Sequence, residues 1–224
     1  MKTKKDYIFF DFDGTLVDTG PGIMNATHYA LLKYGINEEN SEILRLFVGP
    51  PLIDSFGKYY GFSYEKACDA VIKFREYYLV KGKTECDIYP RVIEMLDKLK
   101  KAGKHLAIAT GKPEDLAHQI AGQFGLTDYF DTIRGSYVDE EGEHRTDKTE
   151  IINVICDELN ISDPDSCIMV GDRANDIQGA HGAGIKAIGS LWGYGSPEEL
   201  NGAGAEYTAR APLDIADMII NDLL

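Results

Sequence analysis

Short apolar runs that end at polar residues or glycine mark the strands of this chain. They span residues 7–10, 105–109, 167–170 and 185–188, and a shorter strand is predicted near Thr132 and Ile133. The second and third runs lack an alternation of polar and apolar residues. This pattern is typical of parallel strands that helices cover on both faces.

Helical periodicity fills the intervals between most of these runs. Apolar residues recur three or four positions apart from Val92, Leu116, Ile151 and Ile215 onward. Lysines close the first of these segments and Gly103 follows it, which suits the helix dipole and a left-handed cap. Strands that alternate with helices of this length predict an α/β fold with a doubly wound, Rossmann-like parallel sheet.

The stretch from about Gly20 to Thr84 has helical spacing, as at Ala67, Val71 and Phe74, but no buried strand. We interpret it as an all-helical insertion after the first strand. Residues 1–18 and 86–224 then form the α/β core, and residues 19–85 form a second domain. The many aromatic residues of the insertion are interpreted as its own core, and stacking on a nucleobase is the alternative.

The charge balance restricts the partners. The chain of 224 residues has 37 Asp and Glu against 23 Lys and Arg, a formal charge of −14. Such a surface repels the phosphate backbone of nucleic acid polymers. No apolar run reaches the roughly 18 to 20 residues that span a bilayer, and the N-terminus lacks a signal-peptide core. We therefore expect a cytoplasmic protein with neither nucleic acid nor membrane as a partner.

Acidic residues follow two of the predicted strands. Asp11 and Asp13 come after the first run, and Asp172 and Asp176 follow the run at residues 167–170. The carboxyl ends of parallel strands lie at one edge of a sheet, where these side chains can converge. Clustered carboxylates require a counter-charge, and oxygen ligands favour Mg²⁺ over Zn²⁺. The sequence therefore predicts a magnesium site, with a capping aspartate beside an Asp-Gly turn as the alternative for the first pair.

A phosphate-binding element is predicted where the strand at residues 105–109 ends. Thr110, Gly111 and the cation Lys112 precede a helix that is predicted to begin at Pro113. A hydroxyl and the free N–H groups of a helix start suit phosphate oxygens, and a simple helix cap is the alternative. Lys148, at the start of another amphipathic helix, is a candidate for the positive charge that the phosphate requires. A solvated surface lysine is the alternative there.

These elements, in this order, resemble the four motifs of the haloacid dehalogenase-like (HAD) phosphohydrolases. The matching features are DFDGT at Asp11, the strand that ends at Thr110, Lys148, and GDRAND at Asp172. The resemblance covers essentially the whole chain, including the helical insertion, which this superfamily uses as a cap domain. Residues 47–56 and 191–196 resemble the branch of phosphoglycolate phosphatases and bacterial 5′-nucleotidase-like enzymes.

The resemblance implies a Mg²⁺-dependent phosphatase that forms an aspartyl-phosphate. Asp11 is then the nucleophile, and Asp13 is the general acid and base. The implied metal ligands are Asp11, Asp13 through its carbonyl, Asp172 and Asp176. The implied ligands of the phosphoryl group are Thr110, Gly111, Lys148 and Asn175.

The substrate expected from the resemblance is a small phosphorylated metabolite, either phosphoglycolate-like or a nucleoside 5′-monophosphate. Arg45 and Lys58 of the insertion are expected to contact it, and the insertion is expected to close over the site. A phosphomutase has the same core residues and stays an alternative. A phosphate-binding regulatory module of the receiver type is the alternative from another class, although its motifs come in another order and it has no helical insertion. The sequence does not specify an oligomeric state.

Overall fold

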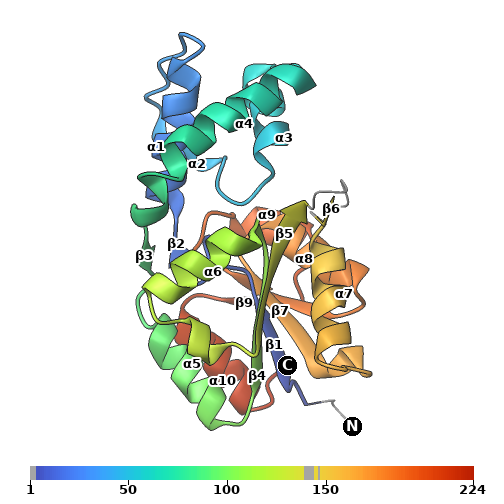
Figure 1. Ribbon diagram of the computed structural model, residues 1–224. Coiled ribbons are helices and arrows are strands. Elements are labelled where there is room, and N and C mark those ends of the chain that lie inside the picture. Colours follow the sequence, from blue (N-terminus) through green and yellow to red (C-terminus); the bar gives the residue numbers. More distant parts are fainter. Residues whose placement is uncertain (1–3, 139–143, 146) are drawn as a thin grey trace. The chain divides into compact units, whose positions relative to one another are not determined.

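The computed structural model describes residues 4–138, 144–145 and 147–224. The chain divides into two compact units (Figure 1). One unit combines Met1–Leu16 with Ile88–Leu224, and the other spans Val17–Asp87.

The first unit is built on a parallel sheet. Among the described residues the sheet has seven strands, in the order β6-β5-β4-β1-β7-β8-β9. Their bounds are β1 (Tyr7–Phe10), β4 (His105–Pro113), β5 (Thr132–Val138), β6 (His144–Arg145), β7 (Cys167–Gly171), β8 (Lys186–Ser190) and β9 (Tyr207–Ala209). All neighbouring strands run parallel except β6, which is antiparallel to β5. The predicted α/β fold is confirmed.

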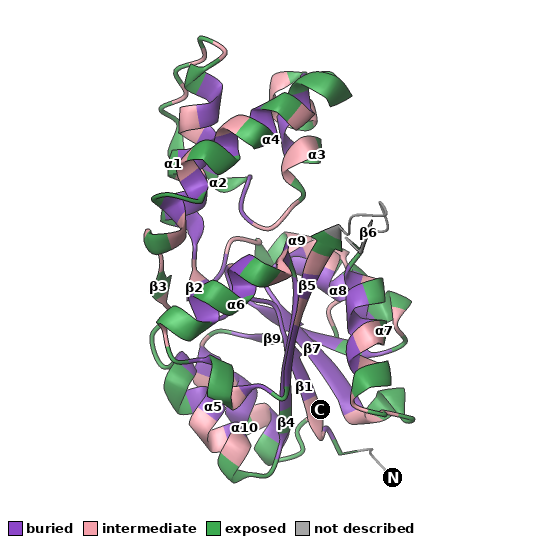
Figure 2. Ribbon diagram, in the orientation of Figure 1, coloured by how far each residue is buried: buried purple, intermediate pink, exposed green. Residues whose placement is uncertain are grey.

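Helices cover both faces of this sheet, as Figure 1 shows. One face carries α5 (Val92–Lys101), α6 (Glu114–Gln123) and α10 (Pro212–Ile220), and the other carries α7 (Lys148–Glu158) and α8 (Ala174–Gly182). The short helix α9 (Pro197–Gly202) follows β8, and single 3-10 turns lie at Thr127–Tyr129 and Pro164–Ser166. The central strands are buried over most of their length (Figure 2). Phe9, Met169 and Ile151 belong to the core cluster beneath α7 and α8.

The register of the central strands brings distant residues together. Phe10 at the end of β1 pairs with Ile108 of β4 on one side and with Val170 of β7 on the other. The next residue, Asp11, donates its backbone N–H to the carbonyl of Val170 at 2.8 Å. The segments that follow these three strands therefore start from the same edge of the sheet.

The second unit is helical. It contains α1 (Gly20–Leu32), α2 (Ser41–Arg45), α3 (Leu52–Tyr60), α4 (Tyr64–Tyr78) and a 3-10 turn at Gly82–Thr84. Two short strands, β2 (Val17–Asp18) and β3 (Asp87–Ile88), pair where the chain enters and leaves it.

Aromatic side chains fill the interior of the helical unit. Phe47, Phe56 and Phe62 are buried. The ring of Phe56 lies 5.0 Å from that of Phe47 and 5.8 Å from that of Phe62. These rings form a hydrophobic core of the unit, as interpreted from the sequence. In the part of the chain that the structure describes, no helix is both long enough and apolar enough to cross a membrane.

Candidate active site

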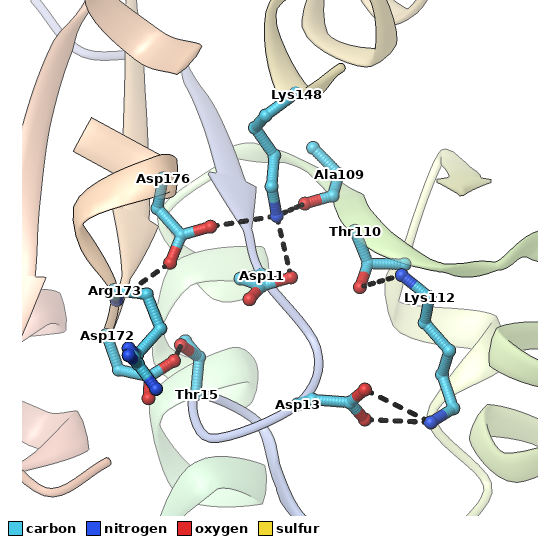
Figure 3. A network of polar contacts seen from close by, with 10 residues as sticks. All are labelled: Asp11, Asp13, Thr15, Ala109, Thr110, Lys112, Lys148, Asp172, Arg173 and Asp176. Atoms are coloured by element: carbon cyan, nitrogen blue, oxygen red, sulfur yellow. Dashed lines mark hydrogen bonds and ion pairs between the residues drawn. The ribbon is translucent and has the colours of Figure 1, made fainter. Parts of the chain in front are cut away.

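Asp11 lies beside a buried lysine at the carboxyl edge of the sheet. The Nζ atom of Lys148 is 2.8 Å from Oδ1 of Asp11 and 2.8 Å from Oδ1 of Asp176, and it donates to the carbonyl of Ala109 at 2.9 Å (Figure 3). Lys148 is the first residue of α7, whose start is capped by the Asp147 side chain. Gly179 of α8 makes room for the stem of Lys148, because a Cβ there would overlap it. The helix start and this glycine together direct the ammonium group to Asp11.

Backbone amides hold the other two carboxylates. Asp172 follows β7, and its Oδ2 accepts from the N–H of Tyr194 at 2.7 Å while its Oδ1 accepts from the hydroxyl of Thr15 at 3.2 Å. Asp176 lies in the first turn of α8, and its Oδ2 accepts from the N–H of Arg173 at 3.0 Å. Both aspartates are fully buried. Neither side chain can turn away without losing these hydrogen bonds.

The three carboxylates fit a divalent cation. One carboxylate oxygen from each of Asp11, Asp172 and Asp176 lies within 4.8 Å of the others. Lys148 supplies one positive charge to these three carboxylates. One charge does not balance three, so the buried cluster keeps an excess of negative charge. Burial and the neighbouring carboxylates raise the pKa of Asp172 well above its usual value, and they raise the pKa of Asp176 to about 6. An all-oxygen donor set with excess negative charge suits Mg²⁺.

Burial lowers the pKa of Lys148, but the charges of Asp11 and Asp176 outweigh it and raise that pKa above its usual value. The amine is therefore an ammonium group at neutral pH. It can neutralise part of the repulsion between an incoming phosphate and the buried acids.

The raised pKa of Asp176 predicts a dependence of stability on pH. Between about pH 4, near the pKa of an unfolded aspartate, and about pH 6, the folded chain binds more protons at this group than the unfolded chain does. The contribution of Asp176 to the free energy of unfolding therefore falls as pH rises through this range. A divalent cation held by these carboxylates would compete with the protons, so the expected stabilisation by Mg²⁺ grows over the same range. Urea unfolding midpoints with Mg²⁺ and with EDTA, measured from pH 4.5 to 7.5, check this. A difference between them that does not change with pH would contradict it.

The loop after β8 packs directly against Asp172. A Cβ at Gly193 would overlap the Asp172 side chain and the carbonyl of Gly14, and a Cβ at Gly195 would overlap the Asp172 carbonyl. Gly14 itself has a φ of +82°. Next to Gly193, the indole N–H of Trp192 donates to the carbonyl of Thr15 at 3.0 Å. Glycine is therefore required for the loop to reach the acidic group.

Gly193→Ala is expected to lower the free energy of unfolding by about 1 to 3 kcal/mol, because the added methyl group overpacks the Asp172 contact. It should also weaken Mg²⁺ binding, since Asp172 must shift. Gly202→Ala is the matched control, because a Cβ there meets open space, and its effect should stay within about 0.5 kcal/mol. Urea unfolding and calorimetric Mg²⁺ titration measure the two effects, and equal behaviour of the two variants would refute the packing argument.

Thr110 and Asp13 lie at the same edge but have different partners. Thr110 is buried near the end of β4, and its hydroxyl oxygen accepts from the backbone N–H of Lys112 at 3.2 Å. The Asp13 carboxylate pairs with the ammonium group of Lys112 and is not one of the three clustered acids (Figure 3). Four acidic side chains were expected to converge, and three of them, Asp11, Asp172 and Asp176, do so.

The remaining candidate residues are placed as follows. Gly111 is exposed, and Asn175 is half-buried on α8. Arg45 and Lys58 are exposed residues of the helical unit, and the Nζ atom of Lys58 lies 5.2 Å from the centre of the Tyr59 ring. Their expected contacts with substrate remain predictions.

Several partners of the acidic residues were not named from the sequence. The Lys112 ammonium group pairs with Asp13, and the Thr15 hydroxyl and the Tyr194 amide donate to Asp172. The Arg173 amide donates to Asp176. The sequence did contain a signal for Lys112, since this lysine directly follows Thr110 and Gly111 of the predicted phosphate-binding element. Backbone amides carry no sequence signal beyond the glycines beside them.

Comparison with known proteins agrees with this geometry. Residues 8–190 match the haloacid dehalogenase-like hydrolase family. A 5′-nucleotidase from Pseudomonas aeruginosa is 38% identical over 193 residues, which cover 86% of each chain. A phosphoglycolate phosphatase from Aquifex aeolicus is 29% identical over 217 residues, covering 97% of this chain and 98% of that one. The tyrosine-protein kinase PtkA from Mycobacterium tuberculosis is 31% identical over 188 residues, covering 84% of this chain but only 62% of the kinase.

The fold has a close counterpart among solved structures. A predicted phosphatase from Clostridium acetobutylicum is 38% identical, with a TM-score of 0.91 over 98% of this chain and 100% of that one. The family match extends from β1 to the end of β8, so it includes both segments that carry the clustered acids. The chain therefore belongs to the haloacid dehalogenase-like hydrolases, and its relatives place it among the phosphatases of that family.

Proposed function

We propose that the chain is a Mg²⁺-dependent phosphomonoesterase that acts through an aspartyl-phosphate on a small phosphorylated metabolite. The observation that carries this proposal is the environment of Asp11. Its side chain is 6% exposed, lies beside the Lys148 ammonium group and belongs to a buried acidic cluster at the carboxyl edge of a parallel sheet. A carboxylate is a suitable nucleophile because the acyl phosphate that it forms hydrolyses readily.

In the first proposed step, an oxygen of Asp11 attacks phosphorus, and the bond from phosphorus to the ester oxygen breaks. Asp13 gives a proton to the departing alkoxide. In the second step water attacks the same phosphorus and loses a proton to Asp13. The Asp11 carboxylate is thereby restored, and inorganic phosphate leaves.

The charge of the transferring phosphoryl group must be stabilised throughout both steps. Thr110, Gly111, Lys148 and Asn175 are the proposed ligands of its oxygens. Asp11, the Asp13 carbonyl, Asp172 and Asp176 would hold Mg²⁺, which supplies positive charge for the phosphoryl oxygens. Lys148 holds the nucleophile in place by its contact with Asp11.

The proposed substrate is phosphoglycolate-like or a nucleoside 5′-monophosphate, as the names of two relatives indicate. We propose residues 19–85 as the cap that selects it, with Arg45 and Lys58 as candidate contacts, and residues 1–18 with 86–224 as the catalytic core. Hydrolysis is favoured over the kinase activity in the name of PtkA, because this chain spans 62% of that protein but nearly all of the phosphoglycolate phosphatase.

Phosphate release from phosphoglycolate, sugar phosphates and nucleoside 5′-monophosphates tests the proposal. Release is expected with Mg²⁺, and EDTA is expected to abolish it reversibly. Turnover that survives EDTA would contradict the metal requirement. Conversion of a sugar phosphate without phosphate release would identify a mutase, and a lack of any reaction would favour a regulatory module.

A further inference from the structure

Lys112 is a buried cation that none of the proposed steps uses. Its Nζ atom donates to Asp13 Oδ1 at 3.0 Å and to Oδ2 at 3.1 Å. The Lys112 side chain is 4% exposed and that of Asp13 is 13% exposed. A carboxylate that binds one buried ammonium group through both oxygens has little freedom to rotate.

The backbone fixes where this ammonium group starts. Thr110 and Lys112 lie where β4 departs from its regular register with β5, and both are buried while Gly111 between them is exposed. The N–H of Lys112 donates to the Thr110 hydroxyl, and Gly135 of β5 packs so closely that a Cβ there would overlap the Lys112 carbonyl. The segment that presents Thr110 to the site therefore also places Lys112.

The two acids of the first motif have different lysines as partners, as Figure 3 shows. Asp11 is held by Lys148 from the start of α7, and Asp13 is held by Lys112 from the end of β4. The two carboxylates are therefore held by separate cations. Asp11 stays in the metal-binding cluster, and Asp13 stays outside it.

We propose that Lys112 is a positioning residue that aims the Asp13 carboxyl group at the leaving oxygen of the substrate. This inference rests on the proposed function and deepens it. Because the Lys112 ammonium group lies 3.0 and 3.1 Å from the two oxygens of Asp13, it fixes the plane of the carboxyl group, and a proton on either oxygen has to point away from the ammonium group. Proton transfer needs this oxygen within hydrogen-bond reach of the leaving oxygen.

Leaving-group dependence separates this role from a structural one. Phosphoglycolate and nucleoside 5′-monophosphates release a weakly acidic alcohol that needs the proton, whereas p-nitrophenyl phosphate releases a stable phenolate that does not. Lys112→Met is expected to lower kcat/KM by about 10- to 100-fold for the better of the two alkyl substrates, but by less than about threefold for p-nitrophenyl phosphate. The ratio kcat/KM is the appropriate readout, because it excludes the later hydrolysis of the aspartyl-phosphate.

Lys104→Met provides a matched control. Lys104 is also buried, and it also pairs with an aspartate, Asp6, at 2.9 Å. It directly precedes the first residue of β4, whereas Lys112 lies near the last. Its replacement should leave the ratio of the two kcat/KM values unchanged. Equal losses on both substrates in Lys112→Met would overturn the positioning role.

A double-mutant cycle with Asp13→Asn completes the test. If Lys112 acts through Asp13, adding Lys112→Met to Asp13→Asn lowers kcat/KM for the alkyl substrate no further. A further loss would overturn the proposal. The double variant removes both members of the ion pair, so its comparison with Asp13→Asn decides the matter even if Lys112→Met alone does not fold. A wild-type protein that hydrolyses none of these esters would instead overturn the proposed function.

Discussion

Asp11→Asn is expected to lower phosphate release by on the order of 10⁴-fold or more, the range found when a covalent nucleophile is removed, while the chain stays folded. Asparagine has nearly the same shape, but its amide cannot form the acyl phosphate. The raised pKa values of Asp172 and Asp176 are due in part to the charge of Asp11. Without metal the variant should therefore unfold at the same or a higher urea concentration than the wild type.

Asp6→Asn is the matched control for this variant. Asp6 immediately precedes β1 and pairs with Lys104, so the same change in charge and shape is made outside the site. Its turnover should match that of the wild type. Activity retained in Asp11→Asn would remove the aspartyl-phosphate mechanism, and a collapse of its unfolding midpoint would show a structural role instead.

Lys148→Met is expected to cost about 3 to 5 kcal/mol of unfolding free energy in EDTA, because it leaves Asp11 and Asp176 without their ammonium partner in a cluster of three buried carboxylates. Turnover should also fall, since the variant lacks the ammonium group that is proposed to bind the phosphoryl oxygens. The loss of stability is expected to be larger at pH 8 than at pH 5. The folded-state pKa values of Asp172 and Asp176 are already raised, so protonation at low pH relieves the repulsion.

Urea unfolding at the two pH values measures this effect. The double variant Lys148→Met with Asp176→Asn removes one charge of each sign and should recover much of the stability without the activity. A single variant as stable as the wild type at pH 8 would mean that the carboxylates are already compensated by other groups. Recovery of activity in the double variant would contradict the phosphate-binding role of Lys148.

The strands at the centre of the sheet could be predicted because they are buried on both faces. The run at residues 7–10 coincides with β1, and the run at residues 167–170 is one residue shorter than β7. At the sheet edges the pattern weakens. Strand β5 extends well beyond Ile133, and its next residue, Arg134, interrupts the apolar pattern while pairing with Glu114 and Glu158. The short strand β9 has too few residues to form a recognisable run.

The same contrast holds for the site. Asp11 and Asp172 follow predicted strands, so the parallel register alone places them at one edge. The direction of a side chain in a turn is set by tertiary contacts instead. Asp13 was expected to converge with the other acids, but Lys112 binds its carboxylate elsewhere. The Tyr194 amide reaches Asp172 through the packing of a loop whose only sequence signal is the glycines on either side of Tyr194.

The hydrogen bond from Trp192 to the Thr15 carbonyl places an intrinsic fluorophore next to the acidic cluster. The chain has one tryptophan, and its indole contacts the residue whose hydroxyl donates to Asp172. All intrinsic indole fluorescence therefore comes from a single position beside the acidic cluster. Ligand exchange at that cluster can be followed in stopped-flow experiments without a label, on the native sequence.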